Sequence, residues 1–445
     1  MISTIFEWKS SPTDLAEQLG VRLTNSIRKN YRTSGRLAGA LLESPRTSSQ
    51  KAIGVVGLGA KALLIKSKVP LRPSSLTEDF RSFPNSAVDV RLPSLGPGGA
   101  GEDIPPSWAM GHWQVSLLSS QALTGRGIKI GIIDTGIDLT HPAFDANDRG
   151  GRVCAIASLS RDGVLDGIAA ASAGLSPSDV HFNTYSHWHG THCASILSGA
   201  RIANGGGVAP GVDLYVAKVL DKYNQGTVAS IYAGFDWLAR QKCDIVSASL
   251  GWEGYRDQWA IPIQALISTG AVVVAASGNE YGIAGLGQTR SPANYPFANY
   301  GAFDGELISV GAVDENDAVW ARSGGELSDW PQTYTDDDGN PRPSFFAGAP
   351  RHMVPSLVGP GVDISSAVPG GGYALSSGTS MAVPFIAGLL ALVLEKLRQR
   401  KSNSTAKEAM AILRESVRDL HPEGIDSRSG AGRPEISLIV SRLFA

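Results

Sequence analysis

Residues 376–397 read SSGTSMAVPFIAGLLALVLEKL, a Gly-Thr-Ser turn that leads directly into a long apolar helix. Ser380 stands where the first helical turn begins, at backbone N–H groups that lack partners within the helix. We expect Pro384 in or next to this first turn, where its missing N–H does least harm. The Ser380 hydroxyl has two interpretations, a helix cap or a nucleophile.

Five apolar runs precede this helix and alternate with stretches of helical pattern. The runs are 128–136 (IKIGIIDTG), 213–220 (DLYVAKVL), 243–251 (CDIVSASLG), 271–279 (AVVVAASGN) and 307–313 (LISVGAV). Continuous apolar strands separated by helices predict an α/β fold, with a parallel sheet covered on both faces in three layers. Because ligands bind at the carboxyl ends of such strands, Asp134, Ser249 and Asn279 are expected along one rim.

The stretch 185–200, YSHWHGTHCASILSGA, places three histidines within six residues. Close imidazoles are typical of zinc sites, but no HExxH or CxxC supplies the usual remaining ligands, so we predict no metal. A serine becomes a nucleophile when a histidine takes its proton and a carboxylate orients that histidine. Asp134, His189 and Ser380 supply these three groups, in that order along the chain.

Four segments carry a family resemblance: IGIIDTGIDLTHPAF, HGTHCASILSG, VVVAASGNE and SSGTSMAVPFIAG. Together they resemble the signature blocks of the subtilisin-like serine peptidases, over about residues 107–440. The resemblance implies that Asp134 orients His189, that His189 is the general base and acid, and that Ser380 forms an acyl-enzyme. It also implies that the Asn279 amide and the Ser380 backbone N–H stabilise the oxyanion.

The same resemblance implies a substrate groove between two strand edges, formed by Asn224, Gln225 and Gly226 on one side and Ser249, Leu250 and Gly251 on the other. Arg290 falls near the floor of the side-chain pocket, where it would favour an acidic residue before the cleaved bond. The competing interpretation is that Glu280, near the mouth, and the flexibility of arginine draw its charge away. Cys193 is expected to be a small buried filler beside the histidine block.

Residues 1–92 form a separate N-terminal unit, expected to be small and α+β, with a helix within 12–30 and strands within 52–68. Residues 93–106 are a Pro/Gly-rich linker, and 107–445 form the peptidase domain. Residues 1–72 hold 12 Lys/Arg against 4 Asp/Glu, whereas the whole chain has a net charge of -2. A basic N-terminal segment and an acidic remainder of the chain are compatible with a propeptide that keeps the enzyme inhibited as a zymogen. The alternative is an accessory domain that the protein retains.

The 445 residues are 42% hydrophobic and 18% charged, with three cysteines. This composition predicts no nucleic-acid or membrane partner and no disulfide framework, and the substrate is expected to be a polypeptide. Because no signal peptide is recognised, we expect a cytoplasmic protein, with export by another route left open. No cofactor is expected to be required. Calcium is possible at the acidic turn 335–340, where an exposed turn is the simpler interpretation.

Two other functions share these features. A peptide-processing enzyme of the same fold would pass its acyl group to an amine instead of water, and a non-catalytic scaffold would bind peptides without cleaving them. Long insertions before the histidine and serine segments keep the first alternative open. Intact catalytic segments argue against the second.

Overall fold

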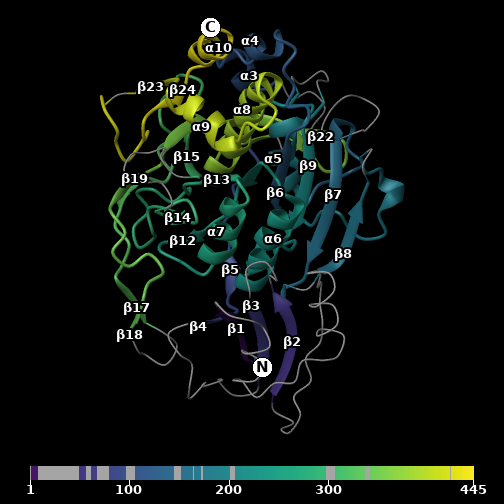
Figure 1. Ribbon diagram of the computed structural model, residues 1–445, viewed down its shortest axis with the longest axis vertical. Helices are drawn as coiled ribbons and strands as arrows, with labels where there is room; N and C mark the ends of the chain where they lie inside the picture. Colours follow the sequence, from purple (N-terminus) through teal and green to yellow (C-terminus); the bar gives the residue numbers. More distant parts are fainter. Residues whose placement is uncertain are drawn as a thin grey trace.

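The computed structural model describes residues 2–8, 50–56, 62–67, 80–96, 106–144, 152–163, 165–171, 174–200, 206–296, 306–335, 341–420 and 422–445. Figure 1 shows how these segments are arranged. The helix expected within 12–30, most of the linker and nearly all of the acidic turn 335–340 lie outside the described residues.

The central sheet has eight strands in the order β20-β15-β13-β11-β6-β9-β7-β8. Their bounds are β6 (Lys129–Asp134), β7 (Arg152–Leu159), β8 (Leu165–Ala170), β9 (Asp213–Lys218), β11 (Ile245–Ala248), β13 (Val272–Ala276), β15 (Leu307–Val313) and β20 (Leu357–Pro360). All neighbours are parallel except β7 and β8, which form an antiparallel edge. The prediction of a parallel sheet is confirmed, and part of the insertion before the histidine segment adds the β8 edge.

Helices cover both faces of this sheet and produce three layers. One face carries α5 (Trp188–Ser198) and α8 (Thr379–Arg400), with α3 (Trp108–His112), α4 (Ser116–Ser119), α9 (Ala406–Arg414) and α10 (Ile436–Phe444) packed beyond them; the other face carries α6 (Val228–Gln241) and α7 (Ala260–Ser268). Side chains of β6 alternate accordingly, with Ile130 and Ile132 in the first core and Ile133 in the second. The sheet is therefore buried on both faces, as its apolar strands require.

The long helix α8 is the core helix of the first layer. It is apolar and long enough to cross a membrane, and it is the one described helix with this property, but 89% of its apolar window is buried inside the protein. Its residues from Thr379 to Glu395 are all buried. The apolar surface of α8 is thus satisfied by protein packing.

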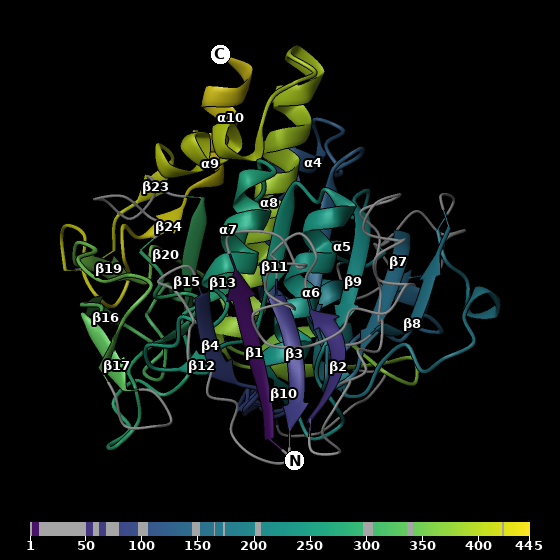
Figure 2. The ribbon, with the colours of Figure 1, turned by 60° about the horizontal axis from the view of Figure 1, so that its bottom comes forward.

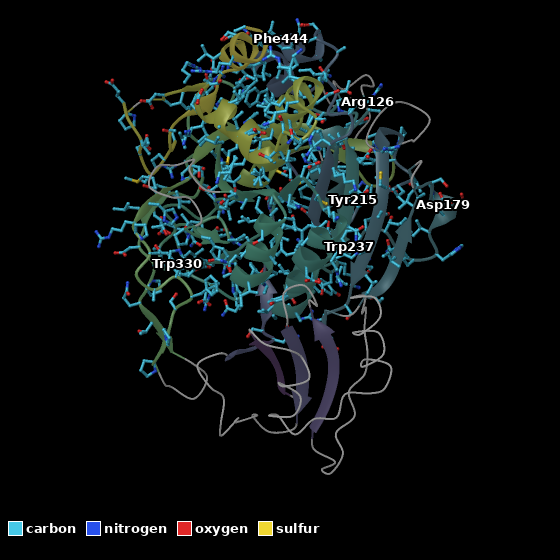
Figure 3. All side chains as sticks on the ribbon, viewed as in Figure 1. Arg126, Asp179, Tyr215, Trp237, Trp330 and Phe444 are labelled. Carbon is cyan, nitrogen blue, oxygen red and sulfur yellow. The ribbon has the colours of Figure 1, made fainter. Side chains whose placement is uncertain are left out.

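Short strands form the rims and insertions of the domain. They are β10 (Gln225–Thr227), β12 (Trp252–Glu253), β14 (Arg290–Ser291), β16 (Glu326–Ser328), β17 (Thr333–Thr335), β18 (Pro341–Pro343), β19 (His352–Val354), β21 (Ile364–Val368), β22 (Gly372–Ser376), β23 (Val417–Arg418) and β24 (Arg433–Pro434), with 3₁₀ turns at Pro142–Phe144 and Pro177–Asp179. The insertion before the serine segment contains Trp330, which is labelled in Figure 3, and the ring centroid of Trp330 lies 5.5 Å from that of Tyr295 outside the insertion. This aromatic contact holds the insertion against the domain.

The N-terminal unit contains an antiparallel sheet in the order β2-β3-β1-β4, made of β1 (Ile2–Trp8), β2 (Gln50–Val56), β3 (Ala62–Ser67) and β4 (Phe80–Pro84). The strands expected within 52–68 are confirmed by β2 and β3. Strand β2 contacts α6, and in Figure 2 the sheet lies over the α6 side of the domain. The chain then continues into β5 (Ala87–Asp89), which pairs with β10 of the larger domain.

Candidate active site

The expected rim is present where the central strands end and two helices begin. Asp134 is the last residue of β6, Ser249 follows β11 and Asn279 follows β13. His189 and Ser380 are each the second residue of their helix, α5 and α8. The fold thus brings together five residues that are separated by up to 246 positions in the sequence.

Asp134 and His189 form a fully buried pair. The Nδ1 atom of His189 lies 3.0 Å from both carboxylate oxygens of Asp134. One of these oxygens also accepts the N–H of Thr135, and the Thr135 hydroxyl accepts the N–H of Gly190 at 2.9 Å. A Cβ at Gly190 would collide with a backbone carbonyl oxygen of the β6 turn, so only glycine allows the helix to approach this closely.

The carboxylate controls the protonation of this imidazole. Burial lowers the pKa of His189, but the charge and hydrogen bond of Asp134 outweigh burial, so the pKa is raised above its usual value. Because Nδ1 faces Asp134, Nε2 is left to accept a proton in the neutral form. This is the tautomer that a general base at this position needs.

The two neighbouring histidines have other surroundings. His192 Nε2 lies 3.0 Å from the carbonyl oxygen of Ala374, and burial lowers its pKa to about 3, so it stays neutral. Burial also lowers the pKa of His187. Of the three histidines predicted as a cluster, only His189 is paired with a carboxylate among the described residues.

Cys193 lies against both His189 and Ser380. Its Sγ atom is 3.8 Å and 3.9 Å from the ring nitrogens of His189 and donates to the carbonyl oxygen of Ser380 at 3.4 Å. Burial raises the pKa of this thiol, so it carries no charge near neutral pH. Asp134, His189 and Cys193 offer ligand atoms within 4.8 Å of one another, but a metal ion there would have to replace the Asp134–His189 hydrogen bond.

Pro384 lies inside α8, just past the first turn and four residues after Ser380. The Ser380 carbonyl therefore loses the N–H that would bond to it in a regular helix. That carbonyl oxygen instead accepts from the Ser249 hydroxyl at 2.9 Å and from Cys193. The helix continues through Arg400, as expected, and the freed carbonyl ties the serine residue to both neighbours.

The Ser380 side chain is buried and donates to the carbonyl oxygen of Ser249 at 3.2 Å. It makes no side-chain cap hydrogen bond to α8, whose cap position is Gly378. An O–H group donates one hydrogen bond. Proton transfer to His189 therefore requires the Ser380 hydroxyl to leave the carbonyl oxygen of Ser249 and donate to Nε2 of His189. The geometry favours the nucleophile interpretation over the helix cap.

Asn279 is held with its amide nitrogen available beside the serine. Its Oδ1 accepts the backbone N–H of Thr379 at 2.9 Å and the Thr379 hydroxyl at 3.0 Å. A Cβ at Gly378 would lie 3.4 Å from Asn279 Nδ2, which places this donor at the start of α8. The Nδ2 group and the backbone N–H of Ser380, the second residue of α8, therefore lie at the same end of the helix.

A segment of the N-terminal unit crosses this site, and we call residues 85–96 the strap. Strand β5 pairs antiparallel with β10, where Asp89 faces Gln225 and Val88 faces Gly226. Asn224 forms the turn before β10, with a positive φ of 61°. The groove edge predicted at residues 224–226 therefore binds an extended chain in the structure.

The strap continues past the serine to the other side of the rim. Val90, Arg91 and Leu92 line a hollow that also includes Ser249, Leu250, Gly251, Asn279 and Ser380. Beyond it, Gly96 donates its N–H to the carbonyl oxygen of Leu375 in β22 at 2.7 Å, and the Ser376 hydroxyl donates to the carbonyl oxygen of Ser94 at 3.0 Å. The strap is thus held on both sides of Ser380.

The strap was not predicted from the sequence, because its residues were divided between the N-terminal unit and the linker. The pattern of VDVRL carries a usable signal: Val88, Val90 and Leu92 alternate with charged residues, as in a half-buried strand. Val88 and Val90 are indeed buried, in the core cluster of α6 and α7.

Arg290 lines the predicted hollow, but its charge is already paired. Its guanidinium donates to both carboxylate oxygens of Glu280, at 2.9 Å and 2.8 Å, and to the carbonyl oxygen of Gly251 at 2.6 Å. Burial alone would raise the pKa of Glu280, but its bonds to Arg290 lower the pKa overall, so Glu280 is ionised. The expectation that Arg290 presents a free positive charge to an acidic side chain is corrected by this pair.

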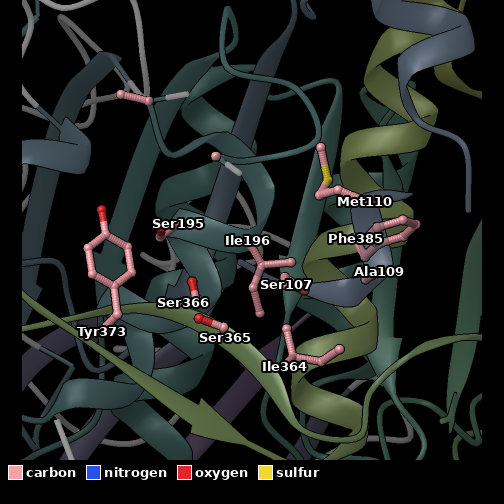
Figure 4. A pocket seen from close by; sticks show the side chains of 12 residues that line it. Ser107, Ala109, Met110, Ser195, Ile196, Ile364, Ser365, Ser366, Tyr373 and Phe385 are labelled. Atoms are coloured by element: carbon pink, nitrogen blue, oxygen red, sulfur yellow. The ribbon is translucent and has the colours of Figure 1, made fainter. Parts of the chain in front are cut away.

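A second cavity lies away from these groups, between α3, α5, α8 and β21 (Figure 4). The hydroxyls of Ser107, Ser365 and Tyr373 have no partner there among the described residues. Ordered water satisfies such buried hydroxyls in many proteins. None of the proposed catalytic groups lines this cavity.

Comparison with known proteins gives one family match: the model of the subtilase family matches residues 125–432. Subtilisin E of Bacillus subtilis is 32% identical over 280 residues, which is 63% of this chain and 58% of that protein. Subtilisin Savinase of Lederbergia lenta is 32% identical over 291 residues, or 65% of this chain and 84% of that protein. An intracellular serine protease of Paenibacillus polymyxa is 33% identical over 273 residues, covering 60% and 67%.

The matched residues include the strands and helices that supply all five residues of the rim. The chain spans 58% of the length of subtilisin E, and the unmatched N-terminal unit is the part that enters the groove. With a match over more than half of its length, the chain belongs to the subtilase family.

Proposed function

We propose that this protein is a serine endopeptidase that hydrolyses peptide bonds through an acyl-enzyme. The observation that carries the proposal is the buried Asp134–His189 pair beside Ser380, at the end of a groove that accepts an extended chain. A polypeptide bound as the strap is bound would place its backbone next to the serine.

The proposed reaction has two half-cycles that use the same groups. Ser380 Oγ attacks the scissile carbonyl carbon as His189 Nε2 removes the hydroxyl proton, and Asp134 stabilises the resulting imidazolium. The C–N bond then breaks, and His189 gives the proton to the leaving amine. Water attacks the ester in the second half-cycle, with His189 again acting first as base and then as acid. These steps require no cofactor.

Replacing Asn279 by alanine is expected to lower kcat by roughly 10²–10³, the magnitude that loss of one oxyanion donor has in a member of this family. The amide contacts the oxyanion only as the tetrahedral species forms, so KM should change much less. Steady-state kinetics on one peptide would measure the split. A loss that appears mainly in KM would contradict the assignment of Asn279 to the oxyanion.

We further propose that the strap is an intramolecular inhibitor, with residues 1–92 as a propeptide. The proposal is supported by the path of residues 85–96, which pair with β10, pass Ser380 and then bond to β22. A substrate must displace this segment to reach the nucleophile. Cleavage in or near the linker would convert the strap into a separate peptide that leaves by dissociation.

Intact mass after treatment with a fluorophosphonate tests both proposals. The full chain is expected to label slowly, and the chain treated with a trace of an unrelated protease to remove its N-terminal unit is expected to label faster, with one added group. The variant Ser380→Ala is the control and should gain no mass in either form.

The outcomes separate the two proposals. Equal labelling rates before and after the cut would contradict the inhibitory strap while leaving the peptidase intact. Absence of label in both forms would contradict the peptidase itself and favour a non-catalytic scaffold. A ligated instead of a hydrolysed peptide product would favour the processing enzyme.

A further inference from the structure

The side chain of Arg290 lines the hollow beside Ser380 and takes up part of its space. This side chain lies between Gly251 and Gly278: a Cβ at Gly251 would be 2.8 Å from Arg290 Cβ, and a Cβ at Gly278 would be 3.3 Å from Arg290 Cγ. The space left by two glycines in facing walls is therefore taken by the arginine stem. Arg290 is 4% exposed, so it does not extend into solvent.

Glu280 fixes Arg290 in this position and cancels its charge. Both carboxylate oxygens of Glu280 accept from the guanidinium, and one of them also accepts the backbone N–H of Asn279 at 2.9 Å. The third guanidinium bond goes to Gly251, in the opposite wall of the hollow. Moving Arg290 out of the hollow would leave Glu280 buried without its cation, which is strongly unfavourable.

We propose that the Glu280–Arg290 pair sets the specificity of this site, making it select small uncharged residues directly before the scissile bond. This proposal rests on the proposed peptidase function. Arg290 closes the pocket to aromatic and large aliphatic side chains. Glu280 prevents the arginine from recruiting acidic side chains, because the pair is neutral as a unit.

The strap agrees with a pocket that takes no long side chain. Arg91 lines the hollow, but its side chain is 47% exposed. Its Nε atom lies 3.8 Å from a carboxylate oxygen of Asp89, whose side chain is also exposed. The strap instead buries Val88 and Val90, which pack with α6 and α7. Leu92 of the strap also lines the hollow and packs against the same core cluster, so the extended chain is held by apolar contacts.

The test compares kcat/KM for one peptide series that differs only in the residue before the scissile bond, with alanine, phenylalanine and glutamate. Wild type, Glu280→Gln and the double variant Glu280→Gln/Arg290→Ala would be assayed. The assay uses the full-length protein or its N-terminally cut form. Each kcat/KM is divided by the fraction of that form that a fluorophosphonate labels, which is the active fraction. Absence of label or of any cleavage would count against the peptidase function, whereas the ratios between peptides report on specificity alone.

Wild type is expected to prefer alanine over both phenylalanine and glutamate by ~10-fold or more. Glu280→Gln keeps the shape but frees the arginine charge, so the glutamate peptide should gain ~10-fold or more relative to alanine. The double variant removes both charges and opens the pocket, so the phenylalanine peptide should gain instead. It leaves no unpaired buried ion, which keeps the test valid if Glu280→Gln does not fold.

Three results would overturn the proposal. Wild type that cleaves the glutamate peptide best would show that Arg290 leaves Glu280 when substrate binds. Wild type that cleaves the phenylalanine peptide as well as the alanine peptide, or a double variant with unchanged ratios, would show that the pair does not limit the pocket.

Discussion

Replacing His189 by alanine is expected to lower kcat by about 10⁶, the largest effect of any single substitution considered. This magnitude is the one that loss of the equivalent base has in a member of the subtilase family. Without the imidazole, no group beside Ser380 accepts its proton, because Cys193 is an uncharged thiol and Ser249 presents only a carbonyl and a hydroxyl. Residual catalysis would come from the oxyanion donors and substrate binding.

The matched control is His187→Ala, two residues away at the cap position of α5. Its side chain makes no cap hydrogen bond, and its backbone carbonyl, which accepts from Thr135, is kept by alanine. We expect less than a ~10-fold change in kcat for this control, with fluorophosphonate labelling retained. A comparable loss in both variants would mean that the segment supports the fold rather than supplying one base; circular dichroism would check that both variants are folded.

The fold was predictable because its signal is local and repeated. Three of the apolar runs lead into a polar residue, and the parallel arrangement follows from the alternation of the runs with helices. That regularity placed Asp134, Ser249 and Asn279 on one rim without any knowledge of long-range contacts. The β8 edge was not predictable in the same way, since 165–170 lacks the continuous apolar run of the other strands.

The hydrogen-bond partners of the site residues were less predictable than the residues that make up the site. Arg290 and Glu280 were both identified, but sequence does not say whether a long side chain turns toward solvent or toward a carboxylate ten residues earlier. Their pairing depends on the two glycines that give the arginine stem its place. Thr135 and Thr379 were visible as parts of DTG and GTS, yet their roles in fixing Asp134 and Asn279 depend on hydrogen bonds that only the fold creates.

Pro384 lies next to the first turn of α8, as expected, but its effect on one particular carbonyl was not predictable from the sequence. A proline early in a helix removes few hydrogen bonds, and the sequence pattern therefore suggested that it does little harm. In the second turn of α8, it removes the partner of one particular carbonyl, that of the proposed nucleophile. Ser249 and Cys193 then replace that partner, so the helix defect links β11, α5 and α8 at the point where the chemistry is proposed.

Asp134→Asn is expected to lower kcat by about 10⁴ while leaving the backbone in place, a magnitude known from serine peptidases with the same triad. An asparagine can donate its amide N–H to Nδ1 of His189, which then carries its own proton on Nε2. In that tautomer the imidazole cannot accept the proton of Ser380. The loss should therefore appear in the chemical step, with stability checked by thermal unfolding.

The pH profile of this variant gives a test independent of the rate. In the wild type, Asp134 raises the pKa of His189, so the base form is lost as pH falls and kcat/KM should decline with an apparent pKa above the usual 6.5 of histidine. Removing the carboxylate leaves burial, which lowers the pKa, so the acid limb of the variant should move to lower pH. The control Asp138→Asn alters a carboxylate that accepts from Thr140 and Gly370 and should leave the acid limb in place. An acid limb that stays fixed in Asp134→Asn would mean that a group other than His189 limits activity at low pH.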